Sequence, residues 1–246
     1  MKAMIFAAGL GTRLKPLTDV MPKALVPVKG KPLLWHTIQK LKNSGFDELI
    51  INVHHFAEQI IDYVKTNNYF DIRIEFSDER DQLLDTGGGI KKASWFFDDG
   101  KPFLIHNVDI LSNLDLRNLY NHFTENDADA CVVVSQRKTE RYLLFDERSI
   151  LRGWVNKKTG AVKSPILNFD PTHFNEYAFS RIHMLSPAIL ELMDSFPDKF
   201  SIIDFYISII NDRDILAYHP EQLNILDVGK PESLTTAANF LETHLD

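Results

Sequence analysis

The residues best placed to do chemistry lie within the first 23 positions. Gly9 and Gly11 follow a short apolar run at residues 3–8, and Arg13 and Lys23 stand a little further on. Two glycines let the backbone turn sharply and approach a ligand with its N–H groups pointing inward. Two cations beside such a turn suit the charge of a phosphate group, so this stretch predicts a phosphate-binding loop.

Two commoner phosphate-binding motifs do not fit this stretch. A Walker P-loop ends in Gly-Lys-Ser/Thr, which does not follow Gly11. A dinucleotide-binding loop has a third glycine, where this chain has Leu14. It also has an acidic residue at the end of the second strand, where this chain reads Asn52-Val53-His54. A lone Gly-x-Gly is equally compatible with an ordinary turn.

Three later stretches carry residue types that suit the same site. Residues 85–90 read Asp-Thr-Gly-Gly-Gly-Ile and predict a loop entering a helix N-terminus, where the backbone can approach a base or a phosphate. A loose surface turn is the alternative. Asp109 and Asp227 each end a short apolar run. Because open α/β sheets bind ligands beyond the carboxyl ends of their strands, both carboxylates meet at one edge if both runs belong to one sheet. Each Asp could also serve only a turn.

The composition limits the class of protein. The chain has 246 residues with a net charge of −7 and no run of Lys or Arg, which argues against nucleic acid as a main partner. The single Cys131 lies in an apolar run, as a buried strand thiol would, and the absence of an internal disulfide is consistent with a reducing compartment. No signal peptide and no membrane-spanning run is visible. We expect one soluble cytoplasmic domain over residues 1–246, as a monomer or a small homo-oligomer.

The hydrophobic pattern alternates strands with helices. Apolar or alternating runs predict strands at residues 3–8, 49–53, 72–76, 102–108, 130–135, 177–185 and 215–218. Helical spacing predicts helices at residues 35–41, 56–64, 116–123, 188–193, 202–210 and 232–241. This order implies an α/β fold with parallel pairing and right-handed crossovers. Residues 140–176 predict an irregular insertion or lid that contains a hairpin of short exposed strands.

The string Gly9-x-Gly11-Thr12-Arg13…Pro22-Lys23 resembles the signature of the sugar nucleotidyltransferases, the nucleoside-diphosphate-sugar pyrophosphorylases. The resemblance continues along most of the chain, through Asp109, a Phe-x-Gly-Ile-His-Val-like stretch at residues 179–184, and Asp-Val-Gly-x-Pro at residues 227–231. Thr-Gly-Gly-Gly-Ile at residues 86–90 looks most like the N-acetylmuramate 1-phosphate uridylyltransferases. The resemblance implies a Rossmann-like three-layer αβα fold with a mixed, mostly parallel central sheet and a small sugar-side lobe.

The resemblance also implies transfer of a nucleotidyl group from a nucleoside triphosphate to a sugar 1-phosphate, with release of pyrophosphate. The favoured substrates are UTP and N-acetylmuramate 1-phosphate. Guanylyl transfer to mannose 1-phosphate is the second choice of reaction, and cytidylyl transfer to a small phosphate alcohol is the third. A nucleotide-sugar sensor without turnover is the alternative from another class. The implied residues are Arg13, Lys23 and Asp109 for catalysis; Ala8, Gly9, Gly11, Thr12, Arg13, Gly87 and Gly88 for the nucleotide; Asn107, Asn168 and Arg181 for the sugar; and Asp109 and Asp227 for Mg²⁺.

Two residues depart from the family pattern at positions that are usually Gly. Val108 precedes the metal-binding Asp109, and its side chain would narrow the space near the metal or move the loop. Arg181 is expected to face the sugar pocket and to contact the sugar's phosphate or an acidic substituent, because a guanidinium prefers an anion with bidentate geometry. His183 on the same predicted strand is expected to be a core histidine with its hydrogen bonds satisfied.

Overall fold

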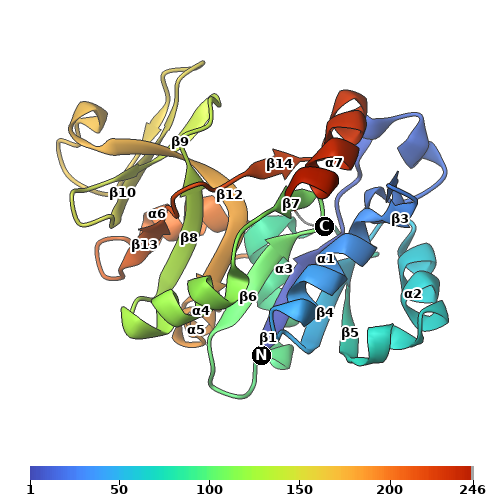
Figure 1. The fold of residues 1–246 in the computed structure, drawn as a ribbon. Coiled ribbons are helices and arrows are strands. Elements are labelled where there is room, and N and C mark those ends of the chain that lie inside the picture. Colours follow the sequence, from blue (N-terminus) through green and yellow to red (C-terminus); the bar gives the residue numbers. More distant parts are fainter. Residues whose placement is uncertain (245–246) are drawn as a thin grey trace.

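The computed structural model describes residues 1–244 and is built around one large sheet (Figure 1). Its strands lie in the order β11-β10-β9-β12-β6-β1-β4-β5, with β8 paired to β12 and β13 paired to β8. The bounds of these strands are β1 Lys2–Phe6, β4 Glu48–Val53, β5 Arg73–Asp78, β6 Phe103–Asn107, β8 Ala130–Ser135, β9 Arg141–Phe145, β10 Leu151–Asn156, β11 Val162–Lys163, β12 Asn175–Leu185 and β13 Ile215–Tyr218.

The sheet is mixed, as expected, and it is partly rather than mostly parallel, with most of the parallel pairing in its N-terminal half. Strand β1 pairs in parallel with β4 and β6, and β4 pairs in parallel with β5, whereas β12 is antiparallel to β6, β8 and β9. Strands β1 and β4 of this half are largely apolar, because helices cover both of their faces, whereas the edge strand β5 is more polar and only partly buried. The carboxyl ends of β1, β4 and β6, at Phe6, Val53 and Asn107, therefore lie along one edge of the sheet.

Helices pack on both faces of the sheet, which confirms the three-layer architecture. Along β1, Ala3 and Ile5 join the core on one face and Met4 joins the core on the other. The first core contains α1 Leu33–Asn43, α2 Ala57–Thr66, α4 Leu116–Glu125 and α7 Pro231–His244; the second contains α3 Asp85–Ala93, α5 Ala188–Met193 and α6 Ile202–Ile209. Within residues 1–244, no helix has both the length and the apolar character needed to cross a bilayer.

The expectation of an irregular insertion at residues 140–176 is wrong in part. Strands β9, β10 and β11 continue the main sheet beyond β12 and project to one side of the molecule (Figure 1). Leu143, Phe145 and Leu151 are buried in the core on the α6 side, so β9 and β10 are not exposed strands, whereas both residues of β11 are exposed. Their apolar runs are too short to reveal from the sequence that another element covers them.

Two small antiparallel pairs stand outside the main sheet. Strand β2 Pro27–Val28 pairs with β3 Lys31–Pro32, and β7 Ile110–Ser112 pairs with β14 Ile225–Asp227. The run before Asp227 is therefore not a strand of the main sheet. In the β7–β14 pair Asp227 lies opposite Ile110, and the Val228 N–H donates to the Asp109 carbonyl at 2.8 Å. This pairing is what brings Asp109 and Asp227 together.

The glycines at residues 87–89 belong to helix α3 and do not form a loop, so this expectation is also corrected. The Gly87 and Gly88 N–H groups donate to the Phe200 carbonyl at 2.9 and 3.3 Å. A Cβ at Gly88 would lie 2.0 Å from the Asp198 carbonyl oxygen, and one at Gly87 would lie 2.2 Å from the Phe200 ring. The absence of side chains at these two positions lets the 198–200 segment pack directly on the helix.

We expect Gly88→Ala to lower the free energy of unfolding by about 1–3 kcal/mol, the usual cost of overpacking. The added methyl group would meet a backbone carbonyl, which cannot rotate away as a side chain can. Gly9→Ala is the matched control, because a Cβ at Gly9 has nothing within 4 Å. Urea unfolding of both variants tests this, and equal stability of the two would contradict the packing argument.

Candidate active site

A cavity of about 500 Å³, called here the main cavity, lies at the carboxyl ends of β1, β4 and β6. It is lined by most of the residues that the sequence singled out, namely Ala8, Gly9, Gly11, Thr12, Arg13, Lys23, Asn107, Asp109 and Arg181. Gly87, Gly88, Asn168 and Asp227 are not among the residues that line it, although Asp227 contacts Arg181, which does. Asn168 is exposed, so the structure does not bring this predicted sugar ligand to the cavity.

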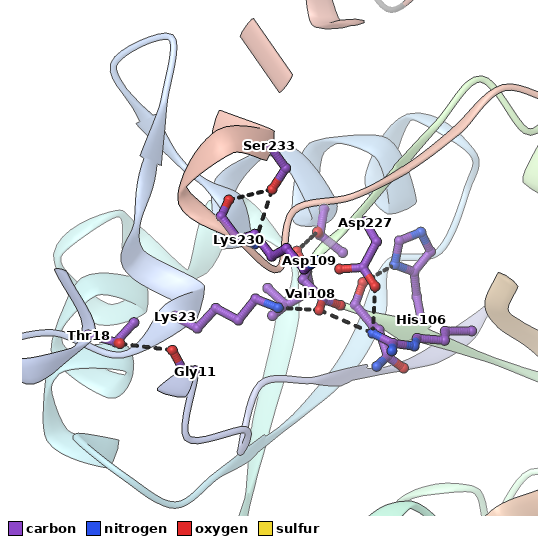
Figure 2. A network of polar contacts seen from close by, with 12 residues as sticks. Gly11, Thr18, Lys23, His106, Val108, Asp109, Asp227, Lys230 and Ser233 are labelled. Carbon is purple, nitrogen blue, oxygen red and sulfur yellow. Dashed lines mark hydrogen bonds and ion pairs between the residues drawn. The ribbon is translucent and has the colours of Figure 1, made fainter. Parts of the chain in front are cut away.

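The glycine turn after β1 leaves backbone donors unused. Gly11 has a φ of +64° immediately before a short helical turn at Thr12–Leu14, and a Cβ there would lie 2.9 Å from the Thr18 side chain. Thr18 Oγ1 donates to the Gly11 carbonyl at 2.9 Å (Figure 2). Within the described chain, the N–H groups of Gly9, Leu10 and Gly11 have no protein acceptor. Such a set of N–H groups can receive the oxygens of a phosphate.

A buried polar pair, missed in the sequence, holds the start of this turn. Asn52 Oδ1 accepts from the Ala7 N–H at 2.7 Å and from the Ala8 N–H at 3.2 Å, so the Ala8 N–H is already engaged. Asn52 Nδ2 in turn donates to Glu79 Oε1 at 2.7 Å. Glu79 is fully buried, and burial raises the pKa of its carboxyl group. The signal in the sequence is the polar Asn52 at the end of an otherwise apolar strand.

Lys23 and Asp109 form an ion pair inside the main cavity (Figure 2). Lys23 begins a short helical turn after Pro22 and is buried, although its ammonium group faces the cavity. Asp109 lies in the turn between β6 and β7, and its side chain is only 8% exposed. Val108 is 4% exposed and packs in the core on the α1 side, and it is also among the residues that line the main cavity.

Arg181 lies between the two carboxylates. Its Nη1 is 3.1 Å from Asp227 Oδ2 and 3.4 Å from Asp109 Oδ2. The sequence argument placed Arg181 against the sugar; in the structure its guanidinium points at the two acidic side chains. Arg13 approaches the same corner, since a Cβ at Gly229 would lie 2.7 Å from Arg13 Nη2 and 2.6 Å from Asp227 Oδ1.

The two carboxylates fit a Mg²⁺ ion. Asp109 Oδ1 and Asp227 Oδ1 are buried and have no hydrogen-bond partner, which is costly for a carboxylate unless another group binds there. No cluster of three or more His, Cys, Asp or Glu side chains suited to a metal occurs within residues 1–244. Mg²⁺ is commonly held by one or two carboxylates and completes its shell with water and substrate phosphates, so two are sufficient.

A second cavity of about 540 Å³, called here the outer cavity, lies on the other side of Arg181. Strands β9, β10 and β12 and helix α6 contribute to its wall, which includes Arg137, Arg141 and Trp154. Arg181 and Asp85 line both cavities, so the two spaces adjoin each other. The outer cavity is therefore rich in cations and has aromatic surface beside them.

His183 takes no part in either cavity. It is 2% exposed, and its Nδ1 forms a 2.5 Å hydrogen bond with the Tyr206 hydroxyl group. Burial lowers the pKa of His183 to about 3, so the ring is neutral over the physiological range. The expectation of a core histidine is confirmed, and its Nδ1 has a hydrogen-bond partner.

Comparison with known proteins agrees with this geometry. One relative is the N-acetylmuramate alpha-1-phosphate uridylyltransferase of Neisseria meningitidis, 44% identical over 116 residues, which cover 47% of this chain and 49% of the relative. The matched region thus spans about half the length of that relative. The mannose-1-phosphate guanyltransferase of Aspergillus fumigatus is 26% identical over 248 residues, covering 100% of this chain and 65% of that protein.

Among solved structures, HddC from Yersinia pseudotuberculosis complexed with GMP-PN superimposes with a TM-score of 0.74 and 26% identity, covering 97% of this chain and 98% of that one. The model of the family described as nucleotidyl transferase matches residues 2–244. Since that match covers nearly the whole chain, the protein belongs to the nucleotidyl transferase family.

Proposed function

We propose that this protein transfers a nucleotidyl group from a nucleoside triphosphate to a sugar 1-phosphate, forming a nucleotide sugar and releasing pyrophosphate. One observation carries this proposal: Lys23, Asp109 and Asp227 converge beside a glycine turn whose backbone donors are unused. This arrangement offers donors and a cation to phosphates, together with two carboxylates for a metal ion. Family membership supports the same reaction class.

The chemistry asks for positioning and neutralisation of charge more than for a general base. A phosphate monoester has a second pKa of about 6, so the attacking oxygen of the sugar phosphate is already largely deprotonated at neutral pH. It attacks the α-phosphorus in line, and pyrophosphate leaves. In this proposal Arg13 holds the leaving pyrophosphate, and Lys23 lies between the α-phosphate and the sugar phosphate. The turn at residues 9–11 receives phosphate oxygens on its N–H groups.

Mg²⁺, held by Asp109 and Asp227, would supply further neutralisation of phosphate charge when it is bound. Each of the two acidic side chains has an Oδ1 atom without a hydrogen-bond partner, which is available to bind the ion. The buried Asn52–Glu79 pair fixes the end of β4 against the start of the turn, so the backbone donors are oriented before substrate arrives. Such preorganisation lowers the reorganisation cost during the reaction.

For the substrates, we infer UTP and N-acetylmuramate 1-phosphate, and a role in supplying precursors of cell wall or polysaccharide. Relatives named for that reaction in Neisseria meningitidis and Caulobacter vibrioides are 44% and 43% identical over their matched regions. The outer cavity supports the same choice, because Arg137 and Arg141 suit the carboxylate of the muramate lactyl group.

Guanylyl transfer to mannose 1-phosphate is the second candidate, favoured by a different observation. The relatives named for that reaction match 95–100% of this chain in three fungi, although at lower identity. A nucleotide-sugar sensor without turnover is the third candidate. A sensor does not need a metal site, whereas Asp109 and Asp227 each have a buried Oδ1 atom without a hydrogen-bond partner, so these two residues argue against a sensor.

A matrix of UTP, GTP, CTP, ATP and dTTP against a panel of sugar 1-phosphates, read by pyrophosphate release, separates these candidates. We expect UTP with N-acetylmuramate 1-phosphate to be among the best pairs. A strong preference for GTP with mannose 1-phosphate would overturn the substrate assignment and leave the reaction class standing. Tight nucleotide-sugar binding with no pyrophosphate from any pair would establish the sensor instead.

A further inference from the structure

Arg181 has an unusual backbone conformation for a residue with a side chain. It lies within β12 at a φ of +59°, in the left-handed region that favours glycine. The pairing of β12 with β8 shifts its register between Phe179 and His183, the two residues that bracket Arg181. Such irregularities redirect side chains and are frequent beside functional sites. The distorted backbone therefore sets the direction of this side chain toward the two carboxylates.

The Arg181 guanidinium group bridges Asp109 and Asp227 through one nitrogen, Nη1. In the part of the chain that the structure describes, Lys23 is the other cation in contact with Asp109, whereas Asp227 has an ion pair with Arg181 alone. A guanidinium group has donors but no acceptor, so it cannot ligate a metal ion. Arg181 thus already neutralises the carboxylates that a divalent cation would neutralise.

We propose that Arg181 is a built-in competitor of the divalent cation, which binds Asp109 and Asp227 only when the guanidinium group leaves them. The inference rests on the proposed function, because that function assigns Mg²⁺ to these two residues. The guanidinium group contacts Oδ2 of each carboxylate, and a divalent ion would bind the neighbouring Oδ1 atoms, so the two cations would repel each other strongly at such short range. Each therefore excludes the other from the site.

The outer cavity can accommodate the Arg181 side chain when it leaves the carboxylates. Arg181 borders the outer cavity as well as the main cavity, and 37% of its side chain is exposed. A rotation of this long side chain carries its charge from the carboxylates into the outer cavity, without movement of β12. Metal binding then requires a conformation that the metal-free protein populates only in part, and the apparent affinity falls by that fraction.

The test measures binding of Mn²⁺ alone, as a probe for the divalent site, by the loss of the free-ion EPR signal at fixed ionic strength. Arg181→Gly should bind Mn²⁺ about tenfold more tightly than the wild type if the competent conformation is about 10% populated. Glycine also suits the φ of +59° at this position, so this variant should fold. Arg181→Gln removes the charge while keeping a long side chain, and it should show the same gain.

Lys163→Ala is the matched control, since Lys163 is a cation that lines the outer cavity but pairs with Asp204, and it makes no ion pair with Asp109 or Asp227 among residues 1–244. It should leave Mn²⁺ affinity unchanged. Unaltered affinity in both Arg181 variants, or an equal gain in Lys163→Ala, would overturn the proposal. Asp109→Asn distinguishes the two levels of inference. If it leaves Mn²⁺ binding intact, the metal assignment within the proposed function fails; if it abolishes binding and the Arg181 variants show no gain, only the competition fails.

Discussion

Lys23→Ala is expected to lower turnover by a factor of about 10²–10³, the usual cost of removing one donor aimed at developing charge in a water-poor site. The ammonium group is buried beside Asp109 and faces the main cavity, so water replaces it poorly. We expect the protein to remain folded, because Arg181 still contacts the same Asp109 oxygen in the variant. Pyrophosphate release measures the loss, and thermal unfolding checks the fold.

Lys15→Ala provides the matched control for this prediction. Lys15 lies on the same proline-rich segment and pairs with Asp19 at 2.9 Å, but its side chain is 60% exposed and it is not among the residues lining the main cavity. Its removal should change turnover little. If Lys23→Ala retained near-normal turnover, Lys23 would serve only as the counter-ion of Asp109, and the phosphate contact proposed for it would be wrong.

The sequence predicted the body of the fold because burial leaves a strong pattern there. Strands covered on both faces are apolar almost throughout, as at residues 49–51, and helices on the sheet need an apolar stripe, as in α1. The lobe at β9–β11 was harder to predict, since its strands are short and their cover comes from residues far along the chain, in α6. The glycines of α3 were wrongly predicted to form a loop for a related reason. Their lack of side chains allows close packing against Phe200, and no local sequence pattern predicts that contact.

Most residues that were predicted for the candidate site line one cavity, but their contacts with one another were not predicted. Lys23 was expected near the glycine turn, and Asp109 was expected there because it ends an apolar run and matches the family resemblance; the structure brings the two together. The contact of Arg181 with the carboxylates could not be foreseen, because it depends on a positive φ and a register shift in β12. The means by which Asp227 reaches Asp109 was also hidden, since strands of three residues, such as β7 and β14, leave no periodic signal.

Asp109→Asn and Asp227→Asn are each expected to abolish most activity, because the proposed metal ion would lose one of its two protein ligands. The substitutions keep the size and shape of the side chains, so the packing around the 8% exposed Asp109 should survive. The substitution should lower the free energy of unfolding only a little at Asp227, whose side chain is 30% exposed. The loss should be larger for Asp109→Asn, because this substitution leaves the buried Lys23 without its charged partner. Pyrophosphate release across a Mg²⁺ titration measures the effect.

The double variant decides whether the two carboxylates act on one ion. Groups that work as a unit give losses that do not multiply, so the double variant should be little worse than the poorer single variant. Asp85→Asn is the matched control, because Asp85 lines the same cavity but forms no ion pair with Lys23 or Arg181 within residues 1–244, and it should keep the wild-type dependence on Mg²⁺. Independent roles would instead multiply the two losses, or leave one single variant with an unchanged Mg²⁺ requirement. Either result would mean that the pairing of β7 with β14 brings these residues together for some purpose other than sharing a metal ion.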